Sequence, residues 1–146
     1  MIKKGQRFIT NSAVAAMGYD LPAAIGAWTA SRDSRCYSQG RDRSGEDLIL
    51  VTGDGSIQMN LQELQTIIHH KMGIKIFLIN NAAIIHPPDP KEFLRRAFDR
   101  HRSGQRGFKL PGYGKTGMCY GYPYIKAEHN SELAKAVEQT LAAEGR

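Results

Sequence analysis

Residues 47–81 read DLILVTGDGSIQMNLQELQTIIHHKMGIKIFLINN and carry the strongest structural signal in the chain. Two short, unbroken apolar runs, at 48–51 and 74–79, are typical of strands buried on both faces of a parallel sheet. Between them, apolar residues at helical spacing predict an amphipathic helix over 60–71, which Gly73 is expected to end. A strand, a helix and a strand in this order indicate a right-handed crossover and a parallel sheet. The predicted fold class is therefore α/β.

The flanking segments extend the same pattern. A helix is predicted over 20–30, with Asp20 as its N-cap, followed by a surface loop over 31–46. Residues 124–125 are a candidate third strand. Ser131 is expected to cap a last helix, whose apolar side would be formed by Leu133, Ala136, Val137 and Leu141. For the central helix, Asn60 with Glu63 three residues later predicts a capping box.

Length and composition narrow the classes of protein. The 146 residues, 41% of them hydrophobic, suffice for one domain, expected to span 1–146. No apolar run is long enough for a bilayer, and the start MIKKGQRFIT does not support a signal peptide. The two cysteines, Cys36 and Cys119, form no CxxC, which argues against a disulfide framework and a cysteine zinc site. A cytoplasmic location with no membrane partner is the expectation.

Two polar clusters follow the two predicted strands. Gly53-Asp54-Gly55-Ser56 follows the first strand, and Asn80-Asn81 follows the second. Ligands of open α/β sheets bind beyond the carboxyl ends of the strands, where both clusters would lie. An Asp and an Asn there could clamp Mg²⁺ against a diphosphate, because Mg²⁺ prefers oxygen ligands and often shares substrate phosphates. The alternative is that both clusters are simple turns, which their pairing at adjacent strands disfavours.

Three stretches give the chain a resemblance to a known family. They are AVAAMGYDLPAAIGA (13–27), residues 47–81 quoted above, and YGYPYIKAEHNSELAKAVEQTL (120–141), together about half of the chain. The combination resembles the C-terminal, diphosphate-binding domain of thiamine-diphosphate-dependent enzymes of the acetolactate synthase type. This resemblance implies a three-layer fold, with helices on both faces of a parallel sheet, here incomplete.

The resemblance also implies site residues. Asp54 and Asn81 would be side-chain ligands of Mg²⁺, with the backbone carbonyl of Ala83 as the third protein ligand. The diphosphate would be held at Gly53, Gly55 and Ser56, by backbone amides and the Ser56 hydroxyl, with Asn81 beside it.

For the rest of the cofactor, Ala15 and Met17 match a segment that contacts the aminopyrimidine through backbone groups. Met17 would support the bent cofactor; plain core packing is its alternative role. His69 and His70 are adjacent on a helix, and we expect them to be surface and packing residues and not ligands.

In the family, the glutamate that activates the cofactor belongs to a separate N-terminal pyrimidine-binding domain, usually of the neighbouring subunit. The resemblance thus implies such a partner, in trans or missing, and a homo-oligomer in the intact relative. The 146 residues alone would form half of a cofactor site, and no catalytic residue is predicted in them.

The resemblance breaks at about 82–119. Between His86 and Met118 lie eight Lys or Arg and three acids, a net charge of +5, against +1 for all other residues. The segment could be an insertion or a basic arm for nucleic acid. A frameshift explains it better: reading one base later from His86, with free third bases, turns HPPDPKEFL into IRQTQKNFF, as expected for the family.

The frameshift hypothesis predicts a loosely packed or disordered segment with accidental basicity. An intact reading frame in several independent clones of the encoding DNA would reject it.

Three functional hypotheses follow. The first is a thiamine-diphosphate- and Mg²⁺-binding domain of an enzyme that decarboxylates and ligates 2-keto acids, in which the cofactor serves as the electron sink. The second is a non-catalytic remnant or small binding module. The third, which the frameshift hypothesis deprives of its main support, is a basic nucleic-acid-binding protein.

Overall fold

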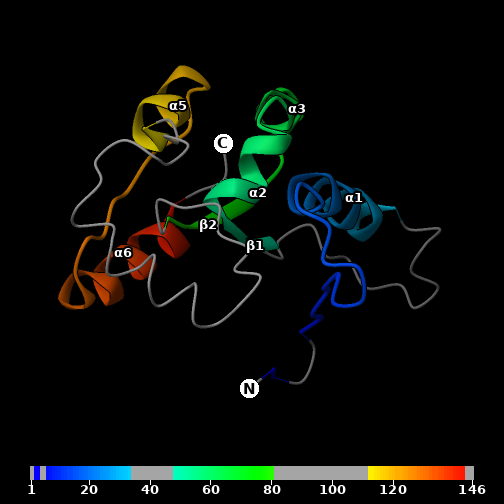
Figure 1. The fold of residues 1–146 in the computed structure, drawn as a ribbon, viewed down its shortest axis with the longest axis horizontal. Coiled ribbons are helices and arrows are strands. Elements are labelled where there is room, and N and C mark those ends of the chain that lie inside the picture. The colour runs from blue at the N-terminus through cyan, green and yellow to red at the C-terminus, as the bar shows by residue number, and fades with distance from the viewer. Residues whose placement is uncertain (1, 4–5, 34–47, 81–111, 144–146) are drawn as a thin grey trace, which may run out of the picture.

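The computed structural model describes residues 2–3, 6–33, 48–80 and 112–143. Its centre is a pair of parallel strands, β1 (Leu48–Gly53) and β2 (Ile74–Ile79), paired in step from Leu48 with Ile74 to Gly53 with Ile79 (Figure 1). The helices are α1 (Asp20–Arg32), α2 (Asp54–Met59), α3 (Glu63–His69), α5 (Tyr113–Cys119) and α6 (Asn130–Ala142). The predicted strands and the α/β class are confirmed, with two strands in the described part of the chain.

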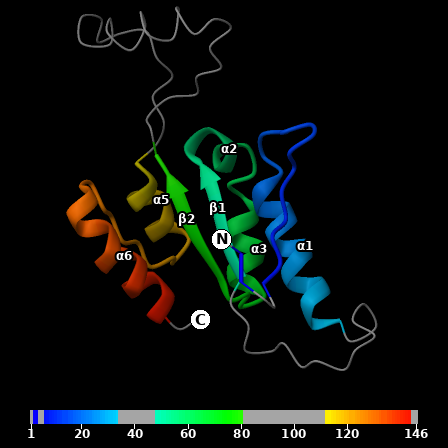
Figure 2. The ribbon, with the colours of Figure 1, turned by 90° about the horizontal axis from the view of Figure 1, so that it is seen from below.

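The two strands point the same way, so both carboxyl ends meet at one edge of the sheet (Figure 2). α2 begins at that edge, and α2 and α3 form the crossover that returns the chain to β2. α1 packs against β1 and also against α3. Within the described ranges, none of the helices combines the length and apolarity needed to cross a bilayer.

The core lies between α1, the crossover helices and the sheet. Leu21 of α1 and Ile67 of α3 are each 1% exposed. Burying an aliphatic side chain of this size stabilises the fold by about 2–3 kcal/mol. The other buried apolar residues are Ala24, Leu50, Ile57, Leu64, Met72, Ile74 and Tyr113.

β1 is not buried on both faces, and this part of the strand prediction is wrong. Leu50 and Thr52 are buried, whereas Ile49 is 52% exposed and Val51 is 65% exposed. Successive strand residues point to opposite faces, and α1 covers the face that carries Leu50. Ile49 and Val51 therefore form an exposed apolar face.

The single helix predicted over 60–71 is two helices in the structure. α2 starts directly after β1, and residues 60–62 form a turn before α3. Asn60 is not an N-cap, because its side-chain amide donates to the carbonyl oxygen of Gly18 at 2.5 Å. The hydroxyl of Thr66 contacts the Glu63 carboxylate at 3.1 Å. The predicted capping box is thus absent from these residues.

The end of α3 is built by Lys71 and not by Gly73. Lys71 has φ 49°, and its N–H donates to Ile68 O at 3.0 Å. The next N–H, of Met72, donates to Ile67 O at 2.9 Å. These two bonds form a Schellman motif, and the accompanying apolar contact is supplied by Ile67 and Met72 in the core.

Residues 124–125 do not form a strand, contrary to the prediction. The segment instead contacts its surroundings through side chains: the Tyr122 hydroxyl donates to Ile74 O of β2 at 3.4 Å, and the Tyr124 ring lies against Gly114. Tyr122 and Tyr124 therefore contribute to side-chain packing and not to a strand ladder.

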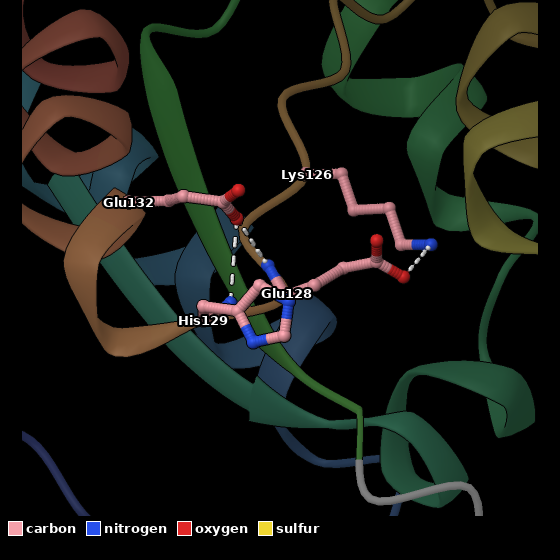
Figure 3. Close-up of polar contacts among 4 residues, drawn as sticks. All are labelled: Lys126, Glu128, His129 and Glu132. Carbon is pink, nitrogen blue, oxygen red and sulfur yellow. Dashed lines mark hydrogen bonds and ion pairs between the residues drawn. The ribbon is translucent and has the colours of Figure 1, made fainter.

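α6 confirms the predicted last helix, but it begins at Asn130 with His129 as N-cap, two residues before the predicted Ser131 cap. Figure 3 shows the Glu132 carboxylate accepting the N–H groups of Glu128 at 2.8 Å and His129 at 3.3 Å. These bonds lower the pKa of Glu132. Lys126 pairs with Glu128 nearby at 2.5 Å.

The predicted apolar side of α6 is only partly covered. Leu133 is 54% exposed and Leu141 is 41% exposed, whereas Ala136 and Val137 are half-buried. The Lys75 ammonium of β2 donates to Leu141 O at 2.5 Å, so the end of α6 is held to the sheet by a polar contact.

The loose packing predicted for 82–119 is wrong for its last part. Residues 113–119 form α5, and Tyr113 is 7% exposed within the core. The Tyr113 hydroxyl donates to Asp54 O, which joins α5 to the start of α2. The rest of the segment, 82–111, lies outside the described residues.

Candidate functional site

Asp54 is the central residue at the carboxyl edge of the sheet. It directly follows the last residue of β1, starts α2 and is 4% exposed. Its Oδ1 accepts the N–H of Gly55 at 2.8 Å, whereas its Oδ2 is buried and has no hydrogen-bond partner among the residues that the structure describes. A buried carboxylate oxygen without a donor is costly. A hard cation at Oδ2 would remove that cost, so the residue fits a Mg²⁺ ligand.

The backbone of Asp54 is held by a residue that the sequence did not indicate. The Tyr113 hydroxyl donates to Asp54 O at 2.6 Å. Burial, and then the charge of Asp54, raise the pKa of Tyr113, so the phenol stays a proton donor at neutral pH. No sequence signal marked Tyr113, because it lies in the segment 82–119, where the sequence departs from the pattern expected from the resemblance.

Gly53, Gly55 and Ser56 surround Asp54 as predicted, but two of their polar groups already have protein partners. The Gly55 N–H is taken by Asp54. The Ser56 hydroxyl donates to Asp20 Oδ1 at 2.5 Å and accepts the Gly18 N–H at 2.8 Å. Their roles toward a diphosphate stay predictions, and the structure brings all three residues to the expected edge.

The segment before α1 lies beside α2. Ala15 has φ 50° and is exposed, and Met17 is half-buried. Gly18 has φ 83°, and a Cβ there would meet Met59 Cβ at 2.9 Å and Asn60 Nδ2 at 3.0 Å. Only glycine allows this approach. Ala15 and Met17 are thus near the Asp54 edge, and their cofactor contacts stay predictions.

Asn81 and Ala83 lie outside the described residues. The register places Ile79, the last residue of β2, opposite Gly53, so the chain leaves β2 beside Asp54. That placement confirms the juxtaposition of the two strand ends, while the ligand roles of Asn81 and Ala83 stay predictions. Among the residues that the structure describes, no group of three or more His, Cys, Asp or Glu could hold a metal ion. Asp54 would therefore need oxygen partners from amides, carbonyls or a phosphate.

His69 and His70 are exposed and stack edge to face, with ring centroids 4.8 Å apart. They lie at the end of α3, before β2 begins, which is the opposite end of the sheet from Asp54. The prediction that they are surface residues is confirmed, and the prediction that they are not ligands stays a prediction.

Comparison with known proteins tests the assignment that this geometry suggests. Residues 1–146 match the family described as the C-terminal TPP binding domain of thiamine pyrophosphate enzymes. The chain belongs to this family. The chain is thus a thiamine-pyrophosphate-binding domain of the kind found in acetolactate synthase and decarboxylase enzymes.

Several curated proteins are similar in sequence to this thiamine-pyrophosphate-binding domain. Pyruvate decarboxylase of Aspergillus parasiticus is 54% identical over 65 residues, 44% of this chain and 11% of that protein. The acetolactate synthase large subunit of Cyanidium caldarium is 31% identical over 141 residues, 95% of this chain and 21% of that protein. Isozyme 3 of Escherichia coli (strain K12), also a large subunit, is 28% identical over 138 residues, 94% and 21% respectively. The chain thus spans between 11% and 21% of these relatives.

Solved structures agree on the fold of the domain. Benzoylformate decarboxylase from Polynucleobacter necessarius superposes with a TM-score of 0.60 at 24% identity, covering 89% of this chain and 22% of that one. A putative thiamin diphosphate-dependent enzyme from Mycobacterium smegmatis gives a TM-score of 0.61 at 24% identity, covering 90% and 21%. Both show the same α/β architecture.

Proposed function

We propose that this domain binds thiamine diphosphate together with Mg²⁺, as the C-terminal part of an acetolactate synthase-like enzyme acting on 2-keto acids. The observation that carries the proposal is the buried Asp54 Oδ2, which has no donor within the described part of the chain, at the edge where β1 and β2 both end. A divalent cation would give this oxygen an interaction partner, and a diphosphate would supply the further oxygen ligands that Mg²⁺ requires.

Each part of the site would have a defined task. Asp54 and Asn81 would hold the cation with their side chains, with the Ala83 carbonyl as third ligand. Gly53, Gly55 and Ser56 would border the diphosphate, while Ala15 and Met17 would contact the aminopyrimidine side. When bound, the cofactor supplies an electron sink for decarboxylation of the 2-keto acid.

Activity would require a second domain. We expect an N-terminal pyrimidine-binding domain to complete the cofactor site, in trans or from a larger chain, and the assembly to be a homo-oligomer. The relatives, of which the chain spans 11% to 21%, support the expectation of a further domain. We also expect the protein in the cytoplasm.

Calorimetry tests the binding proposal. We expect the chain to bind thiamine diphosphate weakly and only with Mg²⁺, and Asp54→Ala to abolish binding because the charged metal ligand is lost. Glu138→Gln is the matched control, since it removes an exposed charge on α6. Equal affinity of Asp54→Ala and the unsubstituted chain would reject the metal role of Asp54.

A second experiment separates the functions. Turnover of pyruvate on adding an N-terminal partner domain would select the enzyme. Cofactor binding without turnover would select the alternative, a non-catalytic binding module. If the chain does not bind thiamine diphosphate but binds nucleic acid with a steep dependence on salt concentration, the third hypothesis, a basic nucleic-acid-binding protein, would be favoured.

A further inference from the structure

The carboxylate of Asp20 joins three elements at the carboxyl edge of the sheet. Asp20 is the first residue of α1. Its Oδ1 accepts the hydroxyl of Ser56 in α2 at 2.5 Å, and its Oδ2 accepts the hydroxyl of Thr52 in β1. Thr52 is 4% exposed, so this contact is shielded from water. One side chain therefore fixes the start of α1 to both the end of β1 and the start of α2.

Two further bonds continue the connection toward the segment before α1. The Ser56 oxygen accepts the Gly18 N–H at 2.8 Å, and the Asn60 amide donates to Gly18 O at 2.5 Å. We call Gly18, Asp20, Thr52, Ser56 and Asn60 the Asp20 clasp. Through it, Gly18, the last residue of the segment 15–18, is bonded to Ser56 and Asn60 at the two ends of the polypeptide that follows Asp54.

The chemistry of the clasp requires a carboxylate at position 20. Both hydroxyls donate to Asp20, one to each oxygen, and an ionised carboxylate accepts at both; the Thr52 hydroxyl also lies 3.3 Å from Gly53 O. An asparagine has an NH₂ group in place of one of these two oxygens, so at these positions it can accept only one of the two bonds. The charge also lies at the start of α1, where the helix dipole favours an anion.

We propose that Asp20 is a positioning residue for the cofactor site. It sets the distance between the segment at Ala15 and Met17 and the diphosphate side at Asp54. It also occupies the Ser56 hydroxyl proton, so the Ser56 side chain serves as a link and does not donate to the diphosphate. This inference rests on the proposed function, and it changes the role predicted for the Ser56 hydroxyl.

Two ligands separate positioning from general stability. Thiamine diphosphate must reach both sides of the site, whereas Mg²⁺-pyrophosphate needs only the Asp54 side. We expect Asp20→Asn to weaken thiamine diphosphate binding by about tenfold, the effect of losing one charge-assisted hydrogen bond. Pyrophosphate affinity should stay within about twofold. Ser56→Ala should behave like Asp20→Asn, and Glu138→Gln should change neither affinity.

Thermal unfolding gives a readout that needs no ligand. Asp20→Asn and Ser56→Ala should each lower the Tm by about 4 °C, and the double variant should fall by clearly less than their sum, because both remove the same bond. Thr52→Val should weaken the clasp, and Thr52→Ser, which keeps the hydroxyl, should restore it. If Thr52→Val does not fold, the Tm of Thr52→Ser is still compared with that of the unsubstituted chain.

The outcomes are distinct. Additive Tm shifts would overturn the inference, as would equal losses of pyrophosphate and thiamine diphosphate affinity in Ser56→Ala, which would mean that the hydroxyl binds the diphosphate. An unsubstituted chain that binds neither ligand with Mg²⁺ would overturn the proposed function, and with it the cofactor role of Asp20. Coupled Tm shifts in that chain would still show the Asp20–Ser56 bond.

Discussion

At the scale of single residues, Tyr113 and Asp20 make tertiary hydrogen bonds that the sequence did not predict. Gly53, Asp54, Gly55 and Ser56 were predictable because a glycine-rich turn after an apolar run has a recognisable composition. The partners of Asp54 and Ser56 come from 59 and 36 residues away. Such contacts depend on how the helices pack, which local spacing does not encode.

Tyr113→Phe tests the support of Asp54 by the phenol. The substitution keeps the buried ring and removes only the hydroxyl that donates to Asp54 O. We expect the free energy of unfolding to fall by about 1–2 kcal/mol, because the carbonyl loses a buried hydrogen bond. Urea denaturation measures it, and an unchanged midpoint would show that the bond contributes nothing.

Tyr122 should make stability depend on alkaline pH. Burial raises the pKa of Tyr122 to about 12, above its value in the unfolded chain, so folding favours the protonated phenol. Its contribution is complete below about pH 10 and is lost as the pH rises toward about 12.

The measurement compares the chain with Tyr122→Phe by urea denaturation at about pH 9 and about pH 11.5. We expect the unsubstituted chain to lose more stability between these two values than the phenylalanine variant. Equal losses would assign the alkaline dependence to other groups.

At the scale of elements, the apolar runs predicted β1 and β2 because strand burial leaves a direct compositional trace. Helix boundaries were less predictable. Asn60 has the composition of an N-cap, but its side chain bonds Gly18, a tertiary contact that replaces the local one. Gly73 has the composition of a helix stop, yet the left-handed position fell on Lys71. In both cases a distant contact or packing at Met72 set the boundary.

Lys71→Gly should stabilise the end of α3. A non-glycine residue at φ 49° carries a steric cost of about 1 kcal/mol, which glycine avoids. We expect the free energy of unfolding to rise by about 0.5–1 kcal/mol in chemical denaturation.

Gly73→Ala is the paired control for this element. Gly73 does not have positive φ, and a Cβ there would meet nothing within 4 Å. It should be tolerated without loss of stability. A destabilised Lys71→Gly chain would contradict the Schellman assignment.

At the scale of the whole molecule, family membership and the α/β class were predictable, while the degree of burial was not. The expectation of two buried faces was derived from complete parallel sheets, in which helices cover both sides. In this chain the Ile49 and Val51 face is exposed, and α6 leaves Leu133 and Leu141 partly uncovered. Amino-acid composition does not show which apolar faces are buried by other parts of the same chain.

The exposed face of β1 should promote self-association. We expect Ile49→Thr with Val51→Thr to raise the concentration at which the chain associates by about tenfold or more, since two exposed apolar side chains contribute on the order of 1–3 kcal/mol on burial. Threonine suits a strand and keeps the branched shape. Sedimentation velocity measures it, and unchanged association would place the contact on another surface.

The equal length and in-step pairing of β1 and β2 have a consequence for insertions and deletions. Gly53 and Ile79, the last residues of the two strands, are paired with each other. Side chains that directly follow the two strands can therefore approach the same ion. One extra residue in β1 would displace Asp54 by about 3.3 Å along the strand, more than the whole length of a Mg²⁺–oxygen bond of about 2.1 Å. Changes of length within either strand should therefore be far less tolerated than changes in the loops at the opposite edge of the sheet.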